Sequence, residues 1–133
     1  MVTRELVLVR FEDAVAWQDA RALARAVYAR TDGVALAQDP LLAASLRQGA
    51  SSVMATIAES FREGELGAAL RRLRQADEAL RELRAMLYWA VDGGLLRARE
   101  HDELVALSSR AARTLAELER SLRTSNLVAL ARD

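Results

Sequence analysis

Apolar residues recur at a helical spacing through the middle of the chain, between residues 66 and 91. Leucine returns every seven residues there, and a second apolar residue follows each leucine three positions later. The first row is Leu66, Leu73, Leu80 and Leu87, and the second is Ala69, Ala76, Leu83 and Ala90. This spacing predicts a long amphipathic helix over 66–92, whose apolar seam other helices must cover.

Three further stretches carry the same rhythm and are bounded by turn or capping residues. Asp39 can cap a helix and Pro40 is favoured at the first helical position, whereas Gly33 and Gly93-Gly94 are natural helix ends. The additional predicted helices span about 13–31, 40–63 and 100–123, with residues 1–11 as an N-terminal arm and 124–133 as a tail.

Four helices joined by short connections predict an all-α fold, an up-down-up-down antiparallel four-helix bundle that forms one domain over residues 1–133. The composition agrees, because 52% of the residues are hydrophobic and the chain contains one proline. Many small residues in the helix over 40–63 predict that it is the most closely packed. Gly49, which costs about 1 kcal/mol of helix propensity relative to alanine, is expected to have a packing reason.

The chain carries 19 basic and 19 acidic residues, and every basic residue is arginine. A formal net charge of +0 argues against strong non-specific binding to nucleic acid. A local phosphate-binding patch remains an alternative, and oligomerisation would multiply it into a ring. Its candidate residues are Arg47, Arg71, Arg72, Arg74 and Arg81. The competing interpretation is a solvated helix face neutralised by Asp77, Glu78 and Glu82.

No residue pattern indicates catalysis, a cofactor, a metal site or a small-molecule substrate. The absence of cysteine excludes disulfides, thiolate chemistry and zinc–thiolate sites. His101 is the only histidine, and we expect it to be solvated or capping, since a zinc site would need two or three carboxylates to converge on it. Ser51 and Ser52 lack a second histidine that could serve as a base. We therefore expect a protein that is not an enzyme.

Two carboxylates, Glu59 and Glu82, stand next to apolar stripe positions. The simpler interpretation is a half-buried ion pair with an arginine such as Arg47. The alternative is a structural polar cluster with a function of its own. That candidate cluster comprises Arg47, Ser52, Thr56, Glu59 and Glu82.

The chain lacks any run of 18 apolar residues, and its beginning lacks the sustained apolar region of a signal peptide. We therefore expect a cytoplasmic protein without a membrane partner.

Residues 11–31, FEDAVAWQDARALARAVYART, resemble the opening of the bacterial four-helix-bundle proteins called 23S rRNA-intervening sequence proteins. That opening reads Phe-acid-acid and then Val-Trp-Gln-x-Ala, and the matching residues are Phe11, Glu12, Asp13, Trp17, Gln18 and Ala20. A second signature of the family is compatible with Leu46, Arg47, Ser52, Ile57, Ala58 and Glu59, and a third with Leu80, Glu82, Leu83 and Leu87. The chain departs from the second signature at Gln48, Thr56 and Ser60, which replace Arg, Asn and Gly.

The resemblance implies a four-helix bundle that assembles as a ring-like homopentamer, with no established enzymatic activity. More distantly, the chain is similar to the accessory variability determinant proteins of diversity-generating retroelements, which implies binding of nucleic acid. Those relatives are strongly basic, unlike this chain. The leading hypothesis is a non-catalytic, self-associating bundle, and the alternative is an RNA- or DNA-binding accessory protein. The candidate contact residues between subunits are Leu6 to Val9, Trp17, Tyr28, Trp89 and 127–130.

Overall fold

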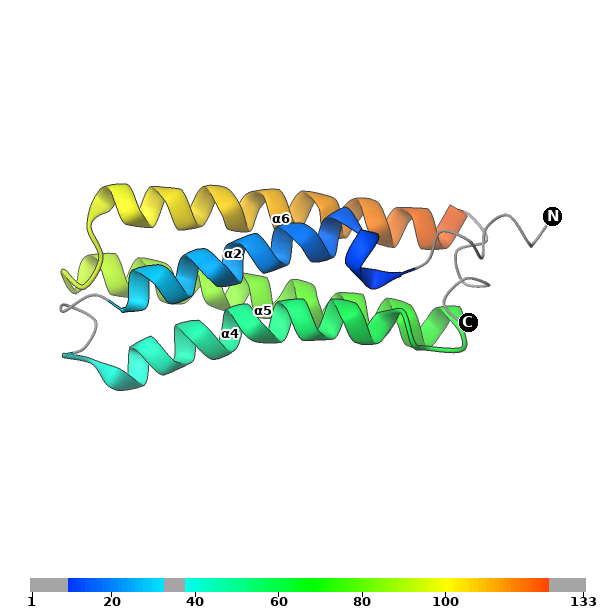
Figure 1. The fold of residues 1–133 in the computed structure, drawn as a ribbon, viewed down its shortest axis with the longest axis horizontal. Helices are drawn as coiled ribbons and strands as arrows, with labels where there is room; N and C mark the ends of the chain where they lie inside the picture. The colour runs from blue at the N-terminus through cyan, green and yellow to red at the C-terminus, as the bar shows by residue number, and fades with distance from the viewer. Residues whose placement is uncertain (1–9, 33–37, 125–133) are drawn as a thin grey trace.

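The computed structural model is a bundle of four long helices (Figure 1) and describes residues 10–32 and 38–124. A single 3₁₀ turn, η1 (Phe11–Asp13), precedes the helices. The helices are α2 (Val15–Thr31), α4 (Pro40–Ser60), α5 (Leu66–Asp92) and α6 (Ala98–Thr124). Neither described range contains a strand. The predicted all-α, four-helix fold is therefore confirmed.

The helices form a closed square in which each helix packs against its neighbours in the chain, and α2 also packs against α6. Helices α4 and α5 share the most extensive contact. Helices α2 and α5 are consequently diagonal to each other, as are α4 and α6. The connections lie at the two ends of the bundle, so consecutive helices run antiparallel (Figure 1).

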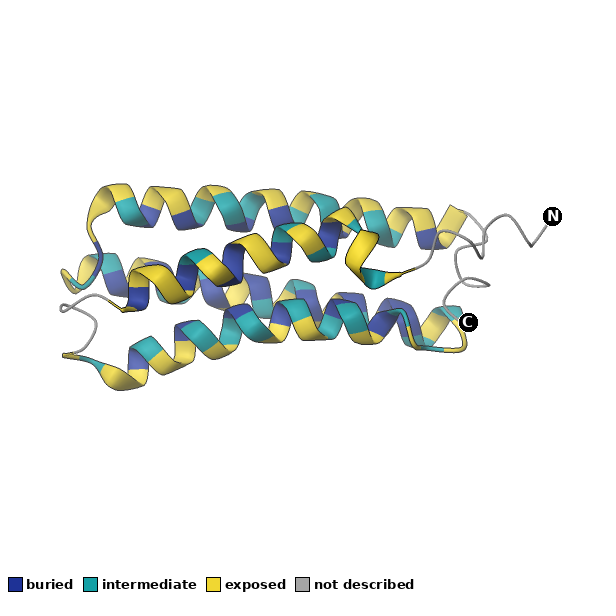
Figure 2. Cartoon of the chain, in the orientation of Figure 1, coloured by how far each residue is buried: buried dark blue, intermediate teal, exposed yellow. Residues whose placement is uncertain are grey.

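The leucine row of α5 faces the interior, as the periodicity predicts. Leu73, Leu80 and Leu87 are fully buried, and Leu66 is half-buried at the start of the helix. Buried positions on all four helices point toward the bundle axis (Figure 2). The other helices contribute Ala16, Ala20, Leu23, Val27, Leu42, Leu46, Ala50, Val53, Ile57, Leu104, Ala111 and Leu115 to this core. The apolar stripes expected of these helices are therefore confirmed.

The start of α4 is capped as predicted, because Asp39 accepts a hydrogen bond from the backbone N–H of Leu42 at 3.1 Å and Pro40 follows it. The predicted end at residue 63 is wrong by three residues. The backbone N–H groups of Phe61 and Arg62 bond to carbonyls three residues earlier, which tightens the chain into a turn.

Two other boundaries differ by two residues. Helix α2 begins at Val15 instead of residue 13, since η1 and the extended backbone of Ala14 precede it. Helix α6 begins at Ala98 instead of residue 100. There the Glu100 carboxylate accepts the N–H of Arg97 at 3.0 Å and caps the first turn.

Gly49 has no steric need to be glycine within the chain. A Cβ built on it would lie 3.7 Å from Leu83 Cδ1, which is ordinary van der Waals contact. The expected packing reason is therefore not found between the helices of one bundle.

The predicted extended arm at Leu6 to Val9 and the predicted tail at 127–130 lie outside the described residues. Within the described part of the chain, no helix is both long enough and apolar enough to cross a membrane.

Candidate functional site

The outward side of α4 is almost free of charge. Between Pro40 and Ala58 the only charged residue is Arg47. The exposed residues of this stretch, which we call the α4 face, are Leu41, Ala44, Ser45, Gln48, Ser52 and Ala55. The exposed positions of α5 and α6 are mostly charged. Depletion of charge is typical of the centre of protein–protein interfaces.

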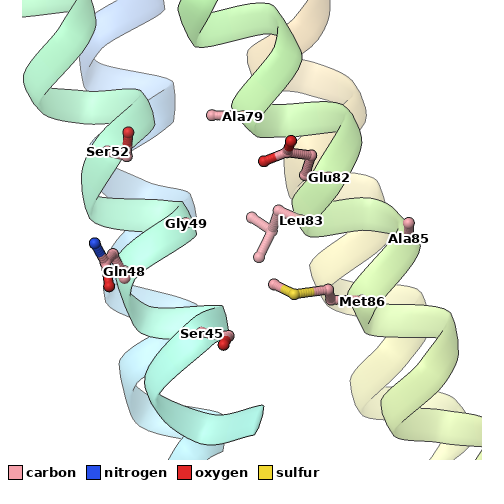
Figure 3. A pocket seen from close by; sticks show the side chains of 9 residues that line it. All are labelled: Ser45, Gln48, Gly49, Ser52, Ala79, Glu82, Leu83, Ala85 and Met86. Carbon is pink, nitrogen blue, oxygen red and sulfur yellow. The ribbon is translucent and has the colours of Figure 1, made fainter. Parts of the chain in front are cut away.

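A hollow of about 580 Å³ runs along the junction of α4 and α5, beside the α4 face (Figure 3). It is lined by Ser45, Gln48, Gly49, Ser52, Ala79, Glu82, Leu83, Ala85 and Met86. The Glu82 side chain extends toward α4 across the hollow. Glu82 is exposed and has no ion-pair partner in 10–32 or 38–124. The hollow therefore presents one unpaired carboxylate among uncharged residues.

A second, smaller hollow of about 360 Å³ lies on the other side of α4, against α2. Its lining residues are Arg21, Ala24, Arg25, Tyr28, Ser51 and Met54. The Arg21 guanidinium lies 5.9 Å from the centre of the Trp17 ring. Neither Arg21 nor Arg25 pairs with a carboxylate in the described residues. We call this surface the basic α2–α4 edge.

Arg47 lies on the α2 side of α4. Its Nη2 is 2.8 Å from Asp32 Oδ1, and its Nε donates to Thr31 Oγ1 at 2.7 Å. The guanidinium also lies 5.1 Å from the centre of the Tyr28 ring. These contacts of Arg47 link α4 to the end of α2.

The predicted ion pair of Glu59 with an arginine is present, but the partner is Arg72 and not Arg47, and Glu82 pairs with no arginine in the described residues. Glu59 lies 3.5 Å from Arg72 on α5, and Glu82 projects into the α4–α5 hollow. Of the five residues proposed as a polar cluster, the structure brings together Ser52 and Glu82, which line the same hollow. Thr56 is half-buried on α4 and does not line it.

The arginines proposed to bind nucleic acid do not form one free patch. Arg72 Nε donates to Glu63 at 2.9 Å, and this hydrogen bond, with the nearby charge of Glu59, raises the pKa of Arg72. Arg81 pairs with Asp77 at 3.1 Å, one helical turn away, as their four-residue spacing allows. Arg71 and Arg74 are exposed, and neither pairs with a carboxylate in the described chain.

His101 is buried, so the expectation of a solvated histidine is wrong. Its ring centre lies 4.7 Å from that of Tyr88 on α5, and its Nε2 has no hydrogen-bond partner in the described residues. Over 10–32 and 38–124, no three His, Asp or Glu side chains are placed to hold a metal ion.

A third hollow, of about 780 Å³, opens at the end of the bundle where α6 begins. Its lining is Arg30, Arg97, Arg99, Glu100 and Glu103. Arg30 Nε donates to Glu103 at 2.7 Å, which raises the pKa of Arg30. Because two of its charges are acidic and Arg30 is already paired, this hollow has little excess charge to attract an anion. The sequence spacing does not predict this hollow, since it joins residues more than 60 positions apart.

Comparison with known proteins identifies a family that this chain matches. The sequence profile described as 23S rRNA-intervening sequence protein matches residues 12–117. This range covers α2, α4 and α5 completely and most of α6. No curated protein matches the chain significantly.

Proposed function

The chain belongs to the 23S rRNA-intervening sequence protein family, and from this membership and its exposed apolar residues we propose that it is a non-catalytic, self-associating bundle. Copies of the chain assemble as a homo-oligomer, in the form of a ring-like homopentamer. Its role is that of a structural subunit, and the assembled ring is the working form.

The observation that carries this proposal is a set of large apolar side chains left outside a complete core. Leu41 is 81% exposed and Trp89 is 72% exposed. These residues belong to the beginning of α4 and the end of α5, which lie at the same end of the bundle (Figure 1). Burying a tryptophan removes ~150 Å² of surface, worth roughly 4 kcal/mol before the costs of ordering. Exposed groups of this kind mark an interaction surface.

Two features support the non-catalytic part of the proposal. Nucleophilic catalysis by serine needs a base within hydrogen-bond reach, and the only histidine packs its ring against Tyr88. The unpaired carboxylate in the α4–α5 hollow, Glu82, has no second acid or base lining that hollow. General acid–base chemistry by a pair of groups therefore finds no support there.

Light scattering coupled to size-exclusion chromatography tests the proposal. We expect a mass five times the 14.6 kDa of one chain, constant over a wide range of protein concentration. A mass of one chain at every concentration would overturn self-association. A constant mass other than five chains would retain self-association and correct the subunit number.

Nucleic-acid binding is a second candidate, favoured by the exposed guanidinium groups of Arg71 and Arg74, which pair with no carboxylate in 10–32 or 38–124. A ring would repeat this pair in every subunit. A gel shift with RNA and DNA at increasing salt tests it, since phosphate contacts make binding weaken steeply with salt. Replacing both arginines by alanine should remove the shift. Absence of any shift at low salt would eliminate this candidate.

A further inference from the structure

We propose that the α4 face and the α4–α5 hollow together form the binding surface for a second copy of this chain, which docks there with its basic α2–α4 edge. This inference rests on the proposed self-association and names the two surfaces that meet. It assigns the incoming partner a specific chemistry, an arginine pair next to small and apolar side chains.

The first reason is the composition of the α4 face. Its exposed residues carry no charge and, apart from Gln48, are small or apolar, although the whole chain has 19 basic and 19 acidic residues. The row from Leu41 to Ala55 is roughly 20 Å long at 1.5 Å per residue. Leu41, at the beginning of α4, and Trp89, near the end of α5, are large exposed apolar groups. These two helix ends lie at the same end of the bundle (Figure 1). An uncharged centre with large apolar anchors is the ordinary anatomy of an interface.

The second reason is charge complementarity, and it identifies the occupant. Glu82 is the only charged residue that lines the α4–α5 hollow. An isolated carboxylate is costly to bury unless a cation pairs with it. Arg21 and Arg25, on the basic α2–α4 edge, are without a carboxylate partner in the described chain. The planar guanidinium of either residue can make a two-pronged hydrogen bond to a carboxylate.

The third reason is geometry. The two surfaces lie on opposite sides of α4, the acidic one toward α5 and the basic one toward α2. A contact between two unlike surfaces of the same chain is heterologous. Repeating it generates a closed ring when the rotation between copies closes. The complementary surfaces therefore account for a ring without requiring a different partner.

Steric blocking of the α4 face is the first test. Ser52→Arg places a long cation on an exposed helical position inside the contact, and arginine is a good helix former. We expect light scattering to give the mass of one chain, while circular dichroism keeps its helical signal. Ala106→Arg, a change of similar size on the exposed side of α6, is the matched control and should leave the mass unchanged.

Exchange of charges is the second test, and it does not depend on how well Ser52→Arg folds. Glu82→Arg and Arg25→Glu should each raise the dissociation constant of the assembly at least about tenfold. Mixing the two variants should restore association between unlike copies, because each then meets a partner with the charge it lacks, although a ring with an odd number of subunits retains one mismatched contact. The double variant Glu82→Arg/Arg25→Glu should also associate.

The outcomes separate this inference from the proposed function. If the unmodified chain is a monomer, the proposed function fails and the inference falls with it. If the unmodified chain associates and Ser52→Arg associates equally well, self-association stands and the assigned surface is wrong. If Arg25→Glu abolishes RNA binding but leaves the mass unchanged, the basic edge serves a nucleic acid, and the inference is overturned.

Discussion

Gly49→Ala should stabilise the chain, although it alters a glycine in the middle of a closely packed helix. Alanine is favoured over glycine in a helix interior by about 1 kcal/mol. The added Cβ would lie 3.7 Å from Leu83 Cδ1 and 3.9 Å from Leu83 Cβ, so it makes contact without a clash. A fully buried methylene contributes about 0.8 kcal/mol, and this partly buried position gains about half of that. The expected total is roughly 1–1.5 kcal/mol.

Urea unfolding followed by circular dichroism measures this gain. With a slope of about 2 kcal/mol per molar urea, the midpoint should rise by roughly 0.5 M while the slope stays unchanged. The melting temperature should rise by about 3–5 °C for a domain of this size. The comparison needs two protein concentrations, because association adds apparent stability that grows with concentration.

The same substitution at Gly94 is the control, because its sign should be opposite. Gly94 has a φ of 76°, a left-handed conformation that costs an alanine about 1–2 kcal/mol. Gly94→Ala should therefore lower the midpoint. If Gly49→Ala also lowered the midpoint at both concentrations, the inferred contact between the added Cβ and Leu83 would be wrong. Glycine would then be required at this position inside the bundle.

Three further substitutions test the core, a cap and the buried histidine, each by urea unfolding. Leu80→Ala should lower the free energy of unfolding by about 3–4 kcal/mol, because the side chain is 1% exposed and its removal leaves a cavity. A loss below about 1 kcal/mol would place the leucine row outside the core. Asp39→Ala should lower the free energy of unfolding by about 1 kcal/mol through loss of the helix cap, whereas Asp39→Asn should change it little. Equal losses in the two variants would contradict the capping role. His101→Leu should leave the free energy of unfolding unchanged or raise it, since Nε2 has no hydrogen-bond partner among the described residues. A loss of several kcal/mol would reveal an unrecognised hydrogen bond.

The helix α5 could be predicted from the sequence with both of its ends. Its seven-residue leucine spacing persists for nearly four repeats, and Gly93-Gly94 follows immediately. The end of α4 could not be predicted as well. Phe61 continues the apolar stripe, but its backbone N–H bonds three residues back, and a stripe does not reveal that change in hydrogen bonding.

The site could be predicted only in part, because periodicity does not encode the hand of a bundle. Periodicity predicts on which flank of α4 Arg47 lies. It does not predict whether α2 or α5 lies beside that flank. In the structure the neighbour is α2, so Arg47 pairs with Asp32 and not with Glu82. The burial of His101 has a similar cause, since a polar residue at a helix start is covered here by Tyr88 of another helix.

The scarcity of charge in α4 is visible in the sequence, where one charged residue stands between positions 41 and 58. Its significance becomes apparent only in the structure, because small residues can lie either in the core or on the surface. The structure assigns Ser45, Gln48 and Ser52 to the surface, beside the α4–α5 hollow.

Cross-linking tests the proposed contact between copies most directly, because the chain contains no cysteine of its own. The double variant Arg25→Cys/Glu82→Cys places one thiol on α2 and one on α5, which are diagonal in the bundle, so the pair cannot close within one chain. After treatment with a bismaleimide long enough to span the replaced arginine and glutamate side chains, a denaturing gel should show a ladder of covalent multimers that ends at a closed ring. Migration of all the protein as single chains, from a sample that light scattering shows to be associated, would contradict the contact.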